Sequence, residues 1–315
     1  MRGANSCHGL GRRHAVRIEQ PVDGATALDG GQRMSAFAKA EWNSQGASSA
    51  EEARISVANG GQLHRPEAGR CVATLMTMTR NTFVLIPGAG GSAWYWHLVV
   101  RRLERCGHEA VPVALPAANE SAGLTEYADA VVHAIGSRVT RHVVLVAQSM
   151  GGFTAPLVCQ RVPVALLVLV NAMIPKPGET PGTWWTNTRH GEAKRRQNQL
   201  DGRRADAPFD PLIDFFHDVP QPVIDEAWAQ GEPRQSDTVF ASPCTFKTWP
   251  AVPTRVLVAS GDRFFPAEFQ RRVARDRLGI SADEMPGGHL AALGQPDELT
   301  ARLVAYAAGA ARRPS

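Results

Sequence analysis

Ser149 lies in a stretch whose residue types could support nucleophilic catalysis. The stretch HVVLVAQSMGGFTAPLVCQ begins as a run of β-branched residues, reaches Ala147-Gln-Ser-Met-Gly151 and continues as a helical pattern. This is the G-x-S-x-G pattern with alanine in the first glycine position, in the strand–turn–helix context that a nucleophile elbow requires. A serine hydroxyl presented on such a turn can attack an acyl carbon.

The residues around Ser149 are small for a physical reason. A turn that lifts the hydroxyl clear of the sheet needs a strained backbone, with φ above zero at the serine, and brings strand and helix close together. Ala147 and Gly151 satisfy that limit. The backbone N–H of Met150 would lie at a helix N-terminus, where it could donate to an oxyanion. The alternative is a loop serine on an ordinary strand–helix junction, where serine and glycine are common.

A second glycine-rich turn, in TFVLIPGAGGSAWYW (82–96), could instead hold a cofactor. Residues 88–93 fit the G-x-G-x-x-G/A spelling of a dinucleotide loop. That site needs an acidic residue at the end of the second strand, whereas EAVPVALP ends in Leu115-Pro116 and has Glu109 at its start. No Gly-Lys-Ser/Thr follows the glycines, which argues against a phosphate-binding P-loop. We therefore expect no organic cofactor.

Strands and helices alternate from residue 82, which predicts an α/β fold with a mostly parallel sheet and helices on both faces. The strands read as near-continuous apolar runs, as buried parallel strands should. The expected strands are 82–86, 109–115, 142–147, 165–171, 254–260 and 283–285. The expected helices are 93–106, 123–135, 152–161, 266–278 and 296–307.

Two segments fall outside this alternation. Residues 1–79 are rich in Gly, Ala, Ser, Gln and Arg without a sustained period, so we expect a poorly ordered N-terminal extension before a single domain at 80–315. Residues from about 173 to 252 separate two strands and are rich in Pro, Gly, Trp and charge. A structureless loop of that length would be improbable, so we expect an inserted cap with its own short helices.

Composition narrows the function classes. The chain has 315 residues, 43% of them hydrophobic and 20% charged, which is ordinary for a globular protein. A net charge of +4 without basic clusters does not suggest nucleic acid or anionic membrane as a partner. Five scattered cysteines without a C-x-x-C pair indicate reduced thiols in a cytoplasmic protein and no zinc site. No apolar run has the length that a membrane helix needs.

From about residue 80 onward the chain resembles the α/β-hydrolase superfamily, in particular its small bacterial esterase-like members with PGAGG or HGAGG after the first core strand. The resemblance implies a serine nucleophile, an acid after a later strand and a histidine near the C-terminus, in that order. It also implies a second oxyanion donor in the glycine-rich loop after the first core strand, here the N–H of Ala89. Pro87-Gly88 stands where His-Gly is common, which leaves that backbone donor in place.

Candidates for the base and the acid follow. His289, in the turn EMPGGHLAAL, lies after the last strand, whereas His190 and His217 fall in the expected cap.

Asp262 ends the buried strand of RVLVASGDRFFP, on the same sheet edge as Ser149, where it could orient the imidazole. Alternatively, Asp262 could cap the N-terminus of the following helix. The rival acids, Glu268 and Asp283, lie in a predicted helix and at the start of a strand, and Asn171-Ala172 occupy the site that carries the acid in some relatives.

We therefore expect a serine hydrolase that acts on a carboxylic ester of a small molecule through Ser149, Asp262 and His289, with oxyanion donors at Ala89 and Met150. Aromatic residues in the cap predict a mainly apolar pocket; they are Trp184, Trp185, Phe215, Phe216 and Trp228. Hydroxynitrile lyase, perhydrolase or carbon–carbon hydrolase chemistry remains open, because the same fold and triad serve these reactions. A ligand-binding receptor with an incidental triad is the alternative from a different class.

Overall fold

The computed structural model describes residues 80–140 and 142–311. They hold a six-stranded parallel sheet in the order β2-β1-β3-β4-β5-β6. The strands are β1 Asn81–Ile86, β2 Glu109–Pro112, β3 His142–Gln148, β4 Leu166–Val170, β5 Thr254–Ala259 and β6 Asp283–Met285. The predicted fold class is thereby confirmed. The N-terminal extension expected at 1–79 lies outside the described residues.

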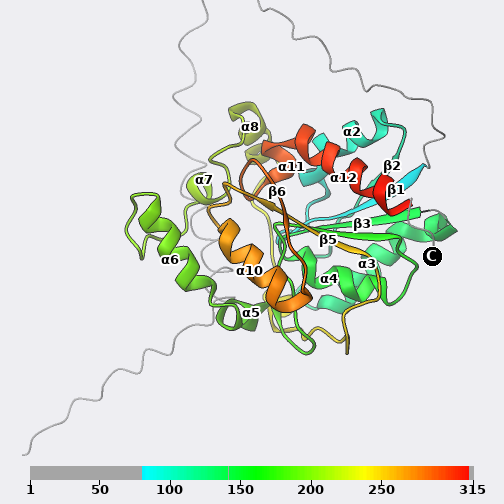
Figure 1. Cartoon of the computed structure of the whole chain (residues 1–315), viewed down its shortest axis with the longest axis horizontal. Coiled ribbons are helices and arrows are strands. Elements are labelled where there is room, and N and C mark those ends of the chain that lie inside the picture. The colour runs from blue at the N-terminus through cyan, green and yellow to red at the C-terminus, as the bar shows by residue number, and fades with distance from the viewer. Residues whose placement is uncertain (1–79, 141, 312–315) are drawn as a thin grey trace, which may run out of the picture.

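Helices cover both faces of the sheet, as Figure 1 shows, with α2, α11 and α12 on one side and α3, α4 and α10 on the other. The helices around the sheet are η1 Ala93–Trp96 (3₁₀), α2 His97–Arg105, α3 Leu124–Ile135, η2 Gly136–Thr140 (3₁₀), α4 Gly151–Cys159, α10 Ala267–Leu278, α11 Ala291–Gly294 and α12 Pro296–Ala311. Between β4 and β5 lie α5 Pro181–Asn187, α6 His190–Leu200, α7 Pro211–Asp214, α8 Gln221–Ala229 and α9 Thr238–Ala241. We call residues 173–252 the helical insertion.

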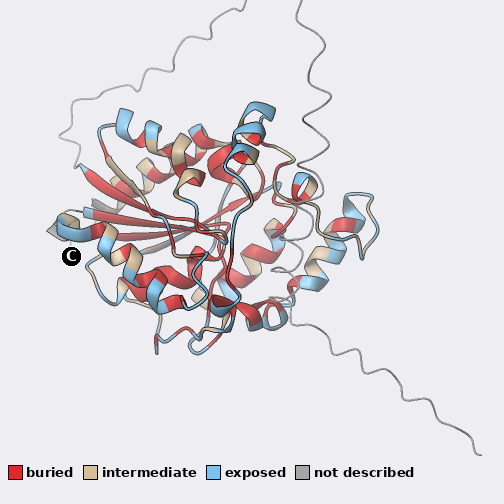
Figure 2. Cartoon of the chain, turned by 180° about the vertical axis from the view of Figure 1, so that it is seen from behind, coloured by how far each residue is buried: buried red, intermediate tan, exposed pale blue. Residues whose placement is uncertain are grey.

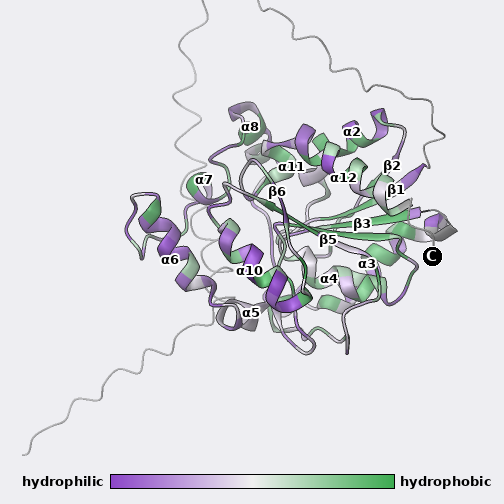
Figure 3. Cartoon of the chain, in the orientation of Figure 1, coloured by the Kyte–Doolittle hydropathy of each residue, from purple (hydrophilic) through white to green (hydrophobic). Residues whose placement is uncertain are grey.

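The alternation of side chains along each strand builds two apolar layers. In β1, Phe83 and Leu85 pack into the layer with α2 and α12, whereas Val84 and Ile86 pack into the layer with α3, α4 and α10. Every β1 residue is buried, and Figure 2 shows the central strands buried between helices whose outer faces are exposed, whereas the edge strand β2 is half-buried. Hydropathy follows the same division in Figure 3, with apolar strands and hydrophilic outer helix surfaces. Burial on both faces explains why the strands lack a polar alternation.

Several elements differ from the prediction in their bounds; α12, for instance, ends at Ala311 instead of residue 307. The helix expected at 93–106 begins as the 3₁₀ turn η1, which buries Tyr95 and Trp96 before α2 starts. The strand expected to reach residue 115 ends at Pro112, although the N–H of Val113 still donates to the carbonyl of Leu85 at 3.0 Å. The four-residue helix α11 was not predicted, because so short an element leaves no periodic pattern.

The carboxyl ends of β3, β4, β5 and β6 lie along one edge of the parallel sheet. Ser149 follows β3, Asn171 follows β4, Asp262 follows β5 and His289 follows β6. Residues from the ends of separate strands therefore meet there, as open parallel sheets generally arrange their sites. The helices α6, α7 and α8 of the insertion gather at one end of the sheet, away from the C-terminus (Figure 1).

The contact between α4 and the end of β4 leads to a stability prediction. A Cβ added at Gly152 would lie 2.0 Å from the carbonyl oxygen of Met173, so Gly152→Ala should lower the free energy of unfolding by about 1–3 kcal/mol. Urea unfolding measures this loss. Gly309→Ala in α12 is the control, because its new Cβ meets no atom within 4 Å. Equal stability of the two variants would contradict the packing described here.

Candidate active site

Three side chains form a hydrogen-bonded chain at the carboxyl edge of the sheet. The Oγ of Ser149 lies 3.1 Å from Nε2 of His289, and Nδ1 of the same ring lies 2.8 Å from Oδ2 of Asp262. An ionised carboxylate only accepts, so Nδ1 carries the ring proton and Nε2 is left to accept from the serine hydroxyl. The structure thus brings together the three residues that the sequence singled out.

The turn between β3 and α4 presents Ser149. Its φ is 50°, in the left-handed region that non-glycine residues rarely adopt. The Ser149 N–H donates to the carbonyl of Val170, and the Ser149 carbonyl accepts from the N–H of Met173, so the strained turn is fixed to the end of β4. A Cβ at Gly151 would lie 2.7 Å from the Pro87 carbonyl oxygen, which explains the need for a small residue there.

Asp262 is held by four donors. Its Oδ1 accepts from the backbone N–H groups of Phe264 and Phe265 at 2.9 and 2.8 Å. Its Oδ2 accepts from Nε2 of Gln270 at 3.1 Å as well as from His289. The carboxylate is fully buried, so these donors replace the water that would otherwise solvate its charge. Asp262 therefore has a fixed orientation toward the imidazole.

Asn171 holds the loop that carries His289. Its Nδ2 donates to the carbonyls of Gly288 and His289, at 3.1 Å each, and its Oδ1 accepts from the N–H of Ala259 at 2.7 Å. Asn171 is fully buried and has a φ of 45°. Gln148 adds a bond from Nε2 to the His289 carbonyl at 3.3 Å. Neither support was predicted from the sequence, in which the available signal was an asparagine directly after a buried strand.

Aromatic rings enclose the imidazole of His289. Phe215 stacks on it with ring centroids 4.9 Å apart and an interplanar angle of 14°. Phe264 and Phe265 meet it edge-on, at 5.1 and 4.9 Å. These contacts leave His289 almost fully buried, which fixes the ring and excludes water from one side of it.

The glycine-rich loop after β1 passes directly beside the serine. A Cβ at Gly88 would lie 2.8 Å from the Cβ of Ser149, so the backbone approaches more closely than a larger residue would allow. The N–H of Gly90 donates to Oε1 of Gln235 at 2.9 Å, and Nε2 of Gln235 donates to the Tyr127 hydroxyl at 3.0 Å. Gln235, which the sequence analysis did not identify, thus connects this loop to the helical insertion and to α3.

The two expected oxyanion donors both line the cavity that contains Ser149. Ala89 belongs to the glycine-rich loop, and Met150 precedes the first residue of α4. Within residues 80–140 and 142–311, neither backbone N–H donates to a protein acceptor. Both residues therefore border the cavity of Ser149 with backbone N–H groups that have no acceptor among the described residues.

The rival candidates for base and acid have other surroundings. His190 is buried, and its Nε2 lies 2.7 Å from the carbonyl oxygen of Phe264. His217 lies on the helical insertion, with Nδ1 buried and without a partner among the described residues. Asp283 accepts from the Tyr306 hydroxyl, and Glu268 is exposed. In the described part of the chain, none of these four side chains is hydrogen-bonded to Ser149.

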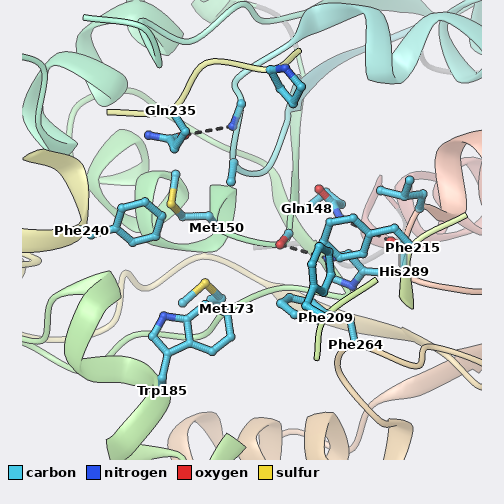
Figure 4. Close-up of a pocket in the computed structure, with 15 residues that line it drawn as sticks. Gln148, Met150, Met173, Trp185, Phe209, Phe215, Gln235, Phe240, Phe264 and His289 are labelled. Atoms are coloured by element: carbon cyan, nitrogen blue, oxygen red, sulfur yellow. Dashed lines mark hydrogen bonds between the residues drawn. The ribbon is translucent and has the colours of Figure 1, made fainter. Parts of the chain in front are cut away.

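The cavity at Ser149 has a volume of about 130 Å³ and mainly apolar walls. Figure 4 shows Trp185, Met173 and Phe240 on one side and Phe209 and Phe215 beside His289 on the other. No Lys, Arg, Asp or Glu side chain is among its described lining residues. Of the aromatic residues expected to shape a pocket, Trp185 and Phe215 line this cavity, whereas Trp184, Phe216 and Trp228 are not among its described lining residues.

Within the described residues, no group of three or more His, Cys, Asp or Glu side chains is placed to bind a metal ion. No helix among them has the length and apolar character that crossing a membrane would require.

Comparison with known proteins adds a family and several relatives. Residues 83–303 match the family model described as alpha/beta hydrolase family. A probable esterase, PIR7A of Oryza sativa subsp. indica, is 33% identical over 110 residues, which cover 32% of this chain and 42% of the relative. Methyl jasmonate esterase 1 of Vitis vinifera is 30% identical over 132 residues, which cover 38% of this chain and 51% of the relative. The chain thus spans about half, or less, of these curated relatives. Both are plant proteins, so the narrower likeness to bacterial members is not confirmed.

Solved structures share the fold over almost their whole length. Polyneuridine aldehyde esterase has a TM-score of 0.57 at 21% identity, covering 72% of this chain and 99% of that one. A pyrethroid hydrolase from Sphingobium faniae has a TM-score of 0.55 at 20% identity, and the match covers 75% of this chain and 100% of that one. At these identities the likeness establishes the fold alone.

His190 leads to a pH-dependent prediction. Burial lowers its pKa to about 4, so the ring is neutral in the folded protein, whereas the unfolded chain binds a proton below about 6.5. The unfolded state therefore binds more protons between these values, and the free energy of unfolding should fall as pH falls from 6.5 toward 4. His190→Phe should reduce this dependence, as measured by urea unfolding at several pH values. His142→Gln, at an exposed position, controls for the loss of a histidine. An unchanged dependence in His190→Phe would contradict the prediction.

Proposed function

The chain belongs to the alpha/beta hydrolase family, and we propose that it is a serine hydrolase that cleaves carboxylic esters of small apolar compounds through an acyl-enzyme. The observation that carries the proposal is the hydrogen-bonded chain from Ser149 through His289 to Asp262. The esterase names of the curated relatives support the same reaction.

In the proposed reaction, Ser149 Oγ attacks the ester carbonyl carbon while Nε2 of His289 takes the hydroxyl proton. Asp262 keeps Nδ1 protonated and stabilises the imidazolium that forms. The tetrahedral intermediate then expels the alcohol, which receives the proton from Nε2. A water molecule, deprotonated by the same nitrogen, attacks the acyl-serine, releases the carboxylic acid and restores the hydroxyl.

The charge that develops on the carbonyl oxygen is assigned to the N–H groups of Ala89 and Met150. Both donors lie beside Ser149 and have no acceptor within the described residues. Such preorganised donors stabilise an oxyanion because they need no reorientation during the reaction. The uncharged, mainly apolar walls of the cavity favour a neutral substrate whose groups next to the ester are apolar.

We extend the proposal to the organisation of the chain. The helical insertion is a cap on a hydrolase domain that spans 80–315, since it supplies Trp185, Phe209 and Phe215 to the walls of the cavity. A cytoplasmic location is supported by Cys106, Cys159 and Cys244, which are free thiols in the part of the chain that the structure describes.

Ser149→Ala tests the nucleophile. Loss of the hydroxyl should remove covalent labelling by a fluorophosphonate probe and lower kcat on nitrophenyl esters about 10⁴-fold or more. Ser121→Ala, in an exposed turn, is the matched control and should keep both activities.

Labelling and turnover that both survive Ser149→Ala would refute the assignment. Labelling of the wild type without turnover of any ester would favour lyase, perhydrolase or carbon–carbon hydrolase chemistry over ester hydrolysis. A wild type that binds an ester but shows neither labelling nor turnover would favour the ligand-binding receptor.

Gln235→Leu tests the support of the glycine-rich loop. Without the acceptor for the Gly90 N–H, the neighbouring Ala89 donor should lose its fixed position, and kcat should fall about 10-fold or more while KM changes little. Affinity for a trifluoromethyl ketone, whose serine adduct carries an oxyanion, should fall in parallel. Gln160→Leu, on the surface at the end of α4, is the control. An unchanged kcat in a folded Gln235→Leu variant would contradict this role.

A further inference from the structure

A second apolar chamber adjoins the cavity that contains Ser149. Its volume is about 270 Å³, compared with about 130 Å³ for the first, so it is about twice as large. The two chambers share six lining residues, which are Ala89, Gly90, Phe209, Phe215, Pro233 and Leu290. The proposed oxyanion donor Ala89 therefore stands where the chambers meet.

Walls that belong to the second chamber alone come from three parts of the fold. Trp94 and Tyr95 come from η1, Ala227 from α8 of the helical insertion, and Leu293 from α11. The polar side chains are fewer, namely Ser92, Gln230 and Glu232, and the first two are exposed. The chamber has no cationic lining residue within the described chain, so it suits a neutral apolar group and disfavours an anionic one.

The direction of proton transfer indicates which chamber holds the alcohol portion of a bound ester. The leaving alcohol must lie next to Nε2 of His289, because that nitrogen protonates it. Phe215 stacks on the His289 ring and Leu290 follows His289 in the chain, and both residues also line the second chamber. In Figure 4 Trp185, Met173 and Phe240, which line the first chamber alone, lie on the side away from His289, whereas Phe209 and Phe215, which line both chambers, lie beside it. His289 itself lines the first chamber. The alcohol side of a bound ester therefore points toward the second chamber.

We propose that the second chamber binds the alcohol portion of the substrate, and that the preferred substrates join a compact apolar acyl group to a larger apolar alcohol. The inference rests on the proposed ester hydrolysis and names the substrate class of that site. Each methylene of the alcohol buried in the chamber should raise kcat/KM about fourfold, until the chamber is full. Methyl esters, whose alcohol leaves the chamber empty, should be poor substrates.

The test fills the second chamber and compares two ester series. One series keeps the acetyl group and enlarges the alcohol from methyl through butyl to benzyl; the other keeps the methyl alcohol and enlarges the acid. Ala227 lines the second chamber and not the first, so Ala227→Phe places a ring in the second chamber alone. It should lower kcat/KM for benzyl acetate about 10-fold or more, because the methylenes that it displaces are each worth about fourfold, and leave the methyl esters within about twofold. Ala227→Leu should give an intermediate loss and serves if Ala227→Phe does not fold.

Ala229→Phe is the matched control, because it makes the same change at an exposed position of α8. Loss confined to large alcohols in Ala227→Phe, with Ala229→Phe unchanged, supports the proposal. Equal loss on both series, loss confined to large acids, or no loss in a folded Ala227 variant overturns it. Failure of the proposed function looks different, since the wild type would then hydrolyse no ester in either series.

Discussion

The close approach of three backbone segments at Ser149 is the constraint on which the rest of the site depends. The serine has a left-handed φ, and the glycines packed around its turn have no room for a side chain. A Cβ at Gly88 would lie 2.8 Å from the serine Cβ, and a Cβ at Gly152 would lie 2.0 Å from the Met173 carbonyl oxygen. The glycine-rich loop after β1, the turn at Ser149 and the segment after β4 are therefore packed against one another, which restricts the orientation of the serine hydroxyl.

Buried amide side chains extend this order to the base. Asn171 and Gln148 both donate to the carbonyl of His289, while Asn171 also accepts from β5. Buried polar groups are costly unless satisfied, so a side chain that pairs with several backbone groups favours one arrangement of the loop. The backbone donors to Asp262 serve the same purpose at the other end of the imidazole.

The helical insertion contributes to the site in two ways. Its aromatic side chains form the walls of both chambers, and its polar side chains hold the loops of the core. Gln235 accepts from the N–H of Gly90, and Oδ2 of Asp218 accepts from the N–H of Gly288 at 2.7 Å, next to His289. The segment that shapes the substrate space thus also restrains the loops that carry the proposed oxyanion donor and base.

Local patterns in the sequence predicted the sheet and the elbow, and the resemblance to the α/β-hydrolase superfamily implied that an acid and a histidine follow the serine in that order. Apolar runs mark strands that are buried on both faces, and the small residues around Ser149 follow from strain within a few residues of it. The supports that hold the site came only from the tertiary structure. Gln235 meets Gly90 across 145 positions, and Asn171 meets His289 across 118. Neither contact leaves a periodic or compositional signal, because a hydrogen bond between distant segments depends on the packing of the elements between them.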